Sequence, residues 1–126
     1  MVKLNYAILA QQAFLTDSGL PNIVGLITRA YSDKVPAMND AYLVIDVSTD
    51  DIKEHSLVIK FKNPSGEEVK KAYENKLGPA KDEKTPIGLL IDIKKIILEK
   101  AGTYIFEIYV DNNLLGKVPL EFSITK

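Results

Sequence analysis

The stretch Thr103-Tyr104-Ile105-Phe106-Glu107-Ile108-Tyr109-Val110-Asp111 decides the fold, because its side chains alternate with a period of two. One side carries Tyr104, Phe106, Ile108 and Val110, and the other carries Glu107 and Asp111. Such alternation is typical of an antiparallel strand with one face on a core and the other in water. The stretch therefore predicts a half-buried β-strand.

The residues after this strand predict a hairpin. Asn112-Asn113 supplies two residues that tolerate a positive φ, as a tight turn requires. A return strand is expected over residues 114–125. Pro119 lacks the N–H that a ladder needs, so this strand is predicted to be an edge strand or to be bulged there.

Two further hairpins precede it. Residues 57–62 alternate in the same way, Asn63-Pro64-Ser65-Gly66 forms a type I turn signal, and the chain resumes over 67–73. At the N-terminus, residues 6–15 and 23–31 are predicted as two arms joined by Thr16-Asp17-Ser18-Gly19. Gly25 within the second arm indicates a bulge or a close backbone approach.

Three other segments complete the pattern. Residues 41–49 form a strand with Leu43, Ile45 and Val47 on one face. Residues 74–86 are a polar connection of unusual length, which predicts either a mobile segment or a place where a partner binds. Residues 87–100 fit either a strand or a short helix, and their isoleucine content and all-β context favour the strand. Strand signals at this spacing predict an all-β sandwich of about 7–9 antiparallel strands.

Composition bounds the class of protein. The 126 residues are 46% apolar and contain no cysteine, which predicts one domain over residues 1–126 without disulfides or thiolate metal sites, and fits a cytoplasmic protein. Sixteen basic residues balance seventeen acidic ones, and Arg29 is the single arginine, so nucleic-acid binding is not expected. Neither a secretory signal nor a membrane span is predicted, because the N-terminal apolar stretch is interrupted and no apolar run is long enough.

A first resemblance lies at the start of the deciding strand. Gly102-Thr103-Tyr104 resembles the glycine-x-tyrosine entry to the sixth strand of immunoglobulin-like domains. The resemblance implies that the Tyr104 hydroxyl bonds to backbone a few residues upstream. Phe106 stands where a half-cystine is expected, and the chain has no tryptophan, so the sequence departs from antibody-type domains.

A longer resemblance covers nearly the whole chain. In order along the chain it runs through Asp17-Ser18-Gly19, Ile23-Val24-Gly25-Leu26-Ile27, Val35-Pro36-Ala37, Asn63-Pro64-Ser65-Gly66, Gly102-Thr103-Tyr104, Val110-Asp111-Asn112 and Leu115-Gly116. This order resembles an uncharacterised family of small bacterial immunoglobulin-like β-sandwich proteins. The resemblance implies the fold, and it implies no activity.

Side chains that carry chemistry are few. His55 is the one histidine, has no histidine or cysteine partner, and is expected to be a solvated loop residue. Carboxylates occur in three places, which are Asp46, Asp50 and Asp51, then Asp82-Glu83, and Asp111. Gathered at one end of a sandwich they could bind calcium. The alternative explanation is that aspartate is common in turns because its side chain bonds to the local backbone. Gly19, Gly25 and Gly66 are too far apart for a phosphate loop.

The tyrosines offer one more reading. Tyr42 and Tyr104 are expected in the core or at a corner between the sheets, whereas Tyr31, Tyr73 and Tyr109 are expected to be exposed. Two tyrosines on one face would stack a sugar or anchor a protein, but a cross-strand aromatic pair, which needs no ligand, is the favoured explanation.

These patterns lead to a functional expectation. The sequence predicts no enzyme, no cofactor, and no catalytic, cofactor-binding or metal-ligating residue. It favours a non-enzymatic, cytoplasmic protein-interaction module that binds through a sheet edge or through residues 74–86. The alternative is a carbohydrate- or calcium-binding sandwich.

Overall fold

The computed structural model describes residues 2–18, 20–79 and 87–125. They form nine strands and no helix. The strands are β1 (Val2–Leu15), β2 (Pro21–Leu26), β3 (Arg29–Ser32), β4 (Ala37–Thr49), β5 (His55–Lys62), β6 (Glu68–Leu77), β7 (Ile87–Leu98), β8 (Gly102–Val110) and β9 (Asn113–Ile124). No helix in the described part of the chain is long and apolar enough to cross a membrane.

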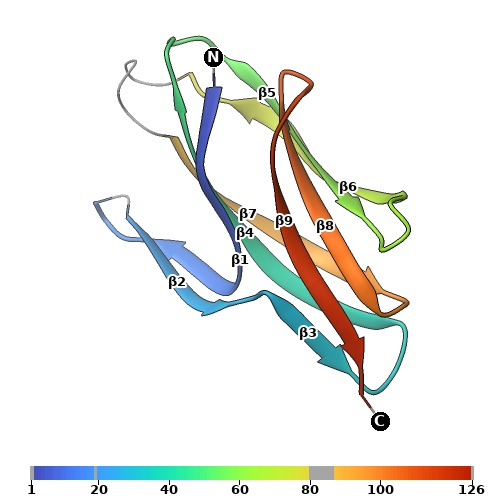
Figure 1. Ribbon diagram of the computed structural model, residues 1–126. Helices are drawn as coiled ribbons and strands as arrows, with labels where there is room; N and C mark the ends of the chain where they lie inside the picture. The colour runs from blue at the N-terminus through green and yellow to red at the C-terminus, as the bar shows by residue number, and fades with distance from the viewer. Residues whose placement is uncertain (1, 19, 80–86, 126) are drawn as a thin grey trace.

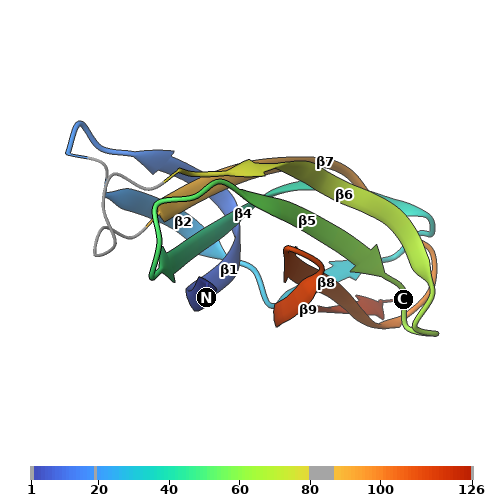
Figure 2. The same ribbon diagram turned by 90° about the horizontal axis from the view of Figure 1, so that it is seen from above.

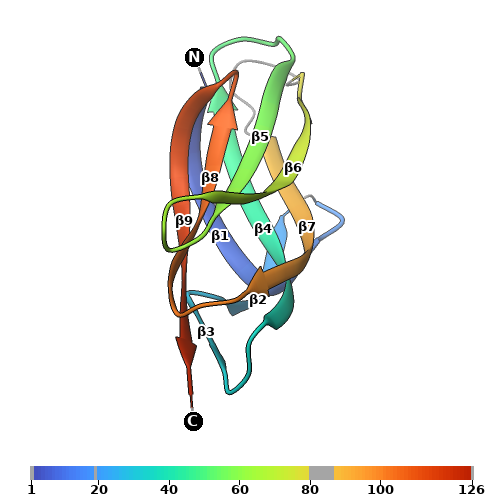
Figure 3. The same ribbon diagram turned by 90° about the vertical axis from the view of Figure 1, so that its right-hand side faces the viewer.

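Two sheets packed face to face make the sandwich (Figures 1 and 3). One has four strands in the order β2-β1-β4-β7, and the other has five in the order β3-β9-β8-β5-β6. Their inward side chains form one core, contributed mainly by β4, β5, β7, β8 and β9. The predicted sandwich is confirmed, and its two ends carry the two chain termini (Figure 1).

The deciding strand alternates as predicted, but its outer face is not in water at Glu107, which is 7% exposed. Its four inward residues are 2% exposed or less; they are Tyr104, Phe106, Ile108 and Val110. The turn lies one residue earlier than predicted, because Asp111 and Asn112 take the positive φ values, 49° and 67°, and Asn113 already pairs with Val110. Aspartate tolerates a positive φ as asparagine does, so the sequence alone did not distinguish a turn at Asp111-Asn112 from one at Asn112-Asn113.

The last strand is only partly an edge. β3 pairs with β9 over Glu121–Ile124 alone, so Pro119 lies where β8 is the described neighbour of β9. The irregularity in the β8–β9 ladder falls beside Tyr109 and not at Pro119. Of the two predicted alternatives, the edge is therefore confirmed at Pro119 and the bulge is not present there, and the edge extends only over the first part of the strand.

The hairpin between β5 and β6 has the predicted turn. The Gly66 N–H donates to the Asn63 carbonyl at 2.9 Å, which closes the type I turn. β6 is longer than predicted and pairs through Leu77, opposite His55. Residues 74–77 are therefore strand and not connection, and residues 80–86 lie outside the described residues.

The N-terminal hairpin differs most from its prediction. Its second arm is not one strand over 23–31, because β2 joins the four-stranded sheet and β3 runs parallel to β9 in the other sheet. Gly25 explains the break: its φ is +72°, and an added Cβ would lie 2.5 Å from Oε1 of Gln11. The predicted close approach at Gly25 is confirmed, and one parallel pair is added to an otherwise antiparallel sandwich.

β7 shows why its sequence was ambiguous. It pairs with β4 as a strand, but Ile93 lies opposite Ala41 and Ile96 opposite Asn39, so the ladder gains a residue between them. The bulge shifts the alternation, and the buried residues are spaced by two, three and two; they are Ile91, Ile93, Ile96 and Leu98. Such spacing imitates part of a helical period.

Candidate functional site

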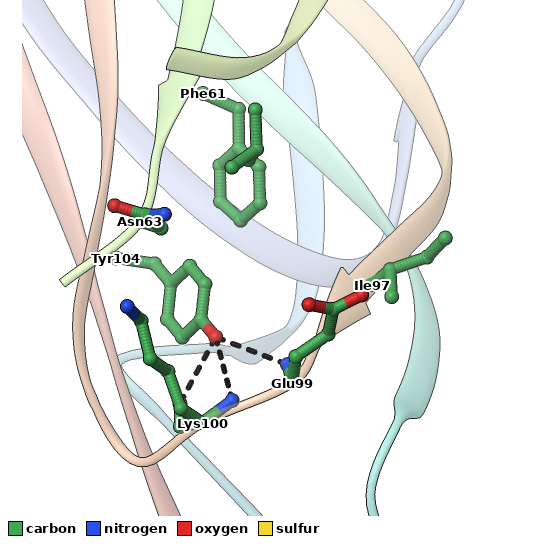
Figure 4. Close-up of a pocket in the computed structure, with 7 residues that line it drawn as sticks. Phe61, Asn63, Ile97, Glu99, Lys100 and Tyr104 are labelled. Atoms are coloured by element: carbon green, nitrogen blue, oxygen red, sulfur yellow. Dashed lines mark hydrogen bonds between the residues drawn. The ribbon is translucent and has the colours of Figure 1, made fainter. Parts of the chain in front are cut away.

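Tyr104 fixes the corner where β7 passes into β8. Its hydroxyl donates to the Lys100 carbonyl at 2.9 Å and accepts the N–H groups of Glu99 and Lys100 at 3.1 and 3.2 Å (Figure 4). The ring is 2% exposed and stacks on Phe61 at a centroid distance of 5.4 Å. The role that the first resemblance implied for Tyr104 is therefore present.

A pocket of about 180 Å³ opens beside this corner. Phe61 and Tyr104 form its floor, and Asn63, Glu99 and Lys100 form its polar rim (Figure 4). Val69 and Ile97 also line it and form its apolar flanks. Val69 and Ile97 are 51% and 45% exposed. The flanks of the pocket are therefore apolar and accessible to solvent, and its rim is polar.

The position of the pocket follows from the sheet order. β6 ends the five-stranded sheet and β7 ends the four-stranded sheet, so the pocket lies between the edges of the two layers. Val69 has no partner in the ladder, because Phe61 pairs with Lys70 and Lys62 with Glu68. A bulge of this kind re-aims a side chain, which accounts for an exposed valine at the mouth.

At the opposite end of β5, His55 joins two carboxylates. Its Nδ1 lies 2.6 Å from Oδ2 of Asp111 and its Nε2 lies 2.9 Å from Oδ1 of Asp51. The imidazole is 11% exposed, so the prediction of a solvated loop residue is wrong. Asp111 also accepts the Ser56 N–H at 2.9 Å, and so the group ties the β8–β9 turn to the start of β5.

These contacts shift the pKa values of all three groups. The hydrogen bond to Asp111 raises the pKa of His55 against the opposing effect of burial, and Asp51 adds to it. The hydrogen bond from His55 lowers the pKa of Asp51, and the bond from the Ser56 N–H, followed by that from His55, lowers the pKa of Asp111. The protonated imidazole is thus favoured, and both of its nitrogens are engaged by carboxylates.

Comparison with protein families identifies the chain. A family of unknown function (DUF6941) matches it over residues 5–123. The chain belongs to this family. That membership confirms the longer resemblance seen in the sequence, and no curated protein matches the chain.

One solved structure supports the fold of this DUF6941 chain, and a second is reported beside it. An immunoglobulin-like protein from Pseudomonas aeruginosa is similar over 98% of this chain and 97% of its own, with 12% identity and a TM-score of 0.52. The alkylpurine DNA glycosylase AlkC from Pseudomonas fluorescens, bound to DNA containing an abasic site analogue, is similar over 97% of this chain, with 12% identity and a TM-score of 0.49. The chain spans 30% of the length of that glycosylase.

The acidic residues of the DUF6941 chain do not meet as one group. Asp51 and Asp111 converge on His55, with Asp50 beside Asp51 in the chain, whereas Asp46 accepts from Asn5 at 2.7 Å. Asp82-Glu83 lie outside the described residues. Among the residues that are described, no group of three or more His, Asp or Glu side chains is arranged to hold a metal ion. Calcium binding stays a prediction.

The tyrosines are separated rather than paired. Tyr31 is 61% exposed on β3, Tyr73 packs against the core from β6, and Tyr109 lies on the outer face of the five-stranded sheet. Tyr42 is half-buried on the outer face of the other sheet, so its predicted place in the core is wrong. These positions bring no two of the tyrosines predicted to be exposed together as a stacking platform.

Sequence reasoning missed the pocket itself. Its lining comes from the ends of β5 and β7, the bulge of β6 and the start of β8, which are far apart in the sequence. No local sequence motif predicts that these strand ends lie together. The one available signal was Tyr104, which located the corner without showing that the neighbouring edges leave a gap.

Proposed function

We propose that this chain is a non-enzymatic, cytoplasmic interaction module of a bacterial cell that binds an extended segment of another protein. The segment lies between β6 and β7 and places one large apolar side chain in the pocket over Phe61 and Tyr104. The observation that carries the proposal is this pocket, with exposed Val69 and Ile97 on its two flanks.

The size of the pocket favours a side chain as its occupant. A cavity of roughly 150 Å³ accommodates a benzene molecule, so about 180 Å³ accepts a phenylalanine or a leucine. Phe61 and Tyr104 would give this anchor aromatic contacts, and the exposed flanks would lose water together with it. The pocket is already formed in the unbound chain, so little order has to be gained on binding.

The rim favours a polar peptide backbone around the anchor. Asn63, Glu99 and Lys100 border the pocket, and Lys100 is held by a 2.7 Å hydrogen bond to Ser65. Glu99 and Lys100 have opposite charges, so the rim selects no strongly charged partner. An extended segment fits this arrangement because its main chain brings donors and acceptors to both sides of one side chain.

The hydrogen bonds of His55 and Tyr104 support a role without catalysis. The histidine–carboxylate group lies at the other end of β5, and both ring nitrogens of His55 are bonded to carboxylates. A general base needs a free nitrogen within reach of a proton to abstract. Tyr104 is engaged with three backbone groups, which supports a structural use of its hydroxyl.

A peptide-display selection against the purified protein tests the proposal. Random peptides should converge on sequences with one phenylalanine, leucine or similar residue at a fixed position. Val69→Asp and Ile97→Asp should each weaken binding of the selected peptides at least about tenfold, since a charge at either flank opposes an apolar contact. Both residues are exposed, so both variants should unfold at the wild-type temperature.

Ile52→Asp is the matched control, because Ile52 is 59% exposed in the connection between β4 and β5. It should bind the selected peptides as the wild type does. The proposal fails if no consensus emerges, or if the selected peptides bind the two flank variants and the control with equal affinity.

A further inference from the structure

The hairpin formed by the end of β1 and by β2 carries an unusual apolar surface. Between residues 10 and 26 the sequence contains one charged side chain, Asp17 at the turn. Six large apolar side chains there are 38% to 63% exposed, and they are Phe14, Leu15, Leu20, Ile23, Val24 and Leu26. The hairpin projects from the side of the sandwich (Figures 1 and 2).

The two faces of the hairpin have different surroundings. Leu15 and Leu20 border a cavity of about 330 Å³ together with Val44 and Leu90, so one face lies over the outer side of the four-stranded sheet. Phe14 pairs with Asn22, two residues before Val24, which places Phe14, Val24 and Leu26 on the opposite face. These three side chains are 51% to 61% exposed.

The exposed area of this face suits a weak contact. Its three apolar side chains present roughly 300 Å², comparable to the largest patch on a typical monomer, which is often functional. A stable interface of standard size buries about 800 Å² on each partner. The face supplies less than half of that area, so the contact is expected to be weak and reversible.

The backbone edge of β2 is poorly suited to pairing with a strand of a partner. Pro21 has no N–H to donate, and Gly25 has a φ of +72°, so only the residues between them are free to extend a ladder. Proline and a left-handed glycine are devices that blunt a sheet edge. A partner therefore gains more from the side chains of the face than from the main chain of the edge.

We propose that a second copy of this chain covers the face formed by Phe14, Val24 and Leu26, so that two hairpins pack across a twofold axis. A twofold contact places the same patch on both partners, and it requires that the patch tolerate itself. Asp17 lies at the turn and not on this face, and the whole chain has a formal net charge of −1, so no strong repulsion opposes the pairing. The contact is independent of the pocket between β6 and β7.

Sedimentation equilibrium of the purified chain over micromolar to submillimolar concentrations tests the pairing. The expected result is a reversible monomer–dimer equilibrium that Val24→Asp or Leu26→Glu weakens at least about tenfold, because each places a charge in the contact. Ile52→Asp should leave it unchanged. A monomer at every concentration, or a dimer that the hairpin variants do not weaken, would overturn the proposal and leave the face to a different kind of partner.

A cross-linking experiment tests the geometry separately. Because the chain has no cysteine, a single introduced thiol reports only its own position. Val24→Cys should be joined between subunits by a short bismaleimide, whereas Ile23→Cys, on the opposite face, should not. Equal cross-linking of the two variants would contradict packing through this face. Val69→Asp should dimerise normally, which separates this contact from the peptide site.

Discussion

The outer faces of the two sheets carry different kinds of side chain. On the five-stranded sheet, Lys62 lies 3.1 Å from Glu107, Tyr109 donates to Glu107 at 2.9 Å, and the Lys60 ammonium lies 4.7 Å from the centre of the Tyr109 ring. On the four-stranded sheet, Val44 lies between Ile8 and Leu90 and is 1% exposed. One face is a network of charges, and the other has an apolar centre at Val44, with Asp46 and Ser48 farther along the same strand.

The difference shows what an apolar outer face requires. The charged face can be left to water, because its side chains satisfy one another and the solvent. The apolar face is covered by the chain's own hairpin, through Leu15 and Leu20. Covering one face in this way exposes the far side of the hairpin, so the uncovered apolar surface moves outward and becomes available to a partner.

The largest effect on stability is expected when a charge replaces a valine on the outer face of each sheet, at Val44 and at Val58. Val44→Asp should destabilise the fold by roughly 3 kcal/mol or more, because it buries a carboxylate without a partner. Val58→Asp, on the outer face of the other sheet, should cost about 1 kcal/mol or less, because Val58 is only half-buried among polar neighbours. Urea unfolding of both variants measures the difference.

A milder pair keeps this comparison informative if Val44→Asp does not fold. Val44→Thr should cost about 1–2 kcal/mol, because it buries a hydroxyl in an apolar layer, and Val58→Thr should stay within about 0.5 kcal/mol of the wild type. Equal losses at the two positions would show that the four-stranded face is open to water and that the hairpin does not cover it.

The next effect compares a tyrosine inside the sandwich with one on the charged face. Tyr104→Phe should destabilise by about 1–3 kcal/mol, because the N–H groups of Glu99 and Lys100 and a carbonyl lose their partner. Tyr109→Phe should cost less than about 1 kcal/mol, since Glu107 keeps Lys62 and gains water. Thermal unfolding of the two variants provides the test, and similar losses would deny that the corner depends on this hydroxyl.

Sequence reasoning succeeded where the chemistry is local. The alternation around Phe106, the turn at Asn63–Gly66 and the role of Tyr104 each depend on neighbouring residues, and all three are present. It failed at the break after Gly25, because a positive φ there sends the next strand to the other sheet, and only tertiary contacts show where that strand goes.

The candidate sites were harder to predict for the same reason. The pocket needs the ends of four strands to converge, and no spacing in the sequence encodes that convergence. His55 appeared isolated because its partner Asp111 is more than fifty residues away in the chain. The low charge of the hairpin was visible in the sequence, but its exposure depends on how β1 bends away from β4.

A smaller effect is expected from the charged face itself. Burial acts to raise the pKa of Glu107, but the hydrogen bond from Tyr109 and the contact with Lys62 outweigh it and hold the pKa below its usual value. Glu107→Gln should therefore lower stability by less than Tyr104→Phe does. The loss should shrink at high salt, because the Lys62 side chain is 31% exposed and ions screen its attraction to Glu107. Urea unfolding at two salt concentrations checks this, and a loss that salt does not change would mean that packing, not charge, matters at Glu107.

The smallest effect concerns His55, which opens β5 just after the connection between the two sheets. Its raised pKa contributes stability that is complete below the unfolded value near 6.5 and is lost as pH rises through the folded value. The lowered pKa values of Asp51 and Asp111 contribute stability above about 4 that is lost as pH falls through their folded values. His55→Gln should therefore destabilise most between roughly pH 4 and 6.5 and progressively less above it. Urea midpoints of variant and wild type across pH 3 to 9 measure this, and a difference that is constant with pH would show that His55 acts by packing alone.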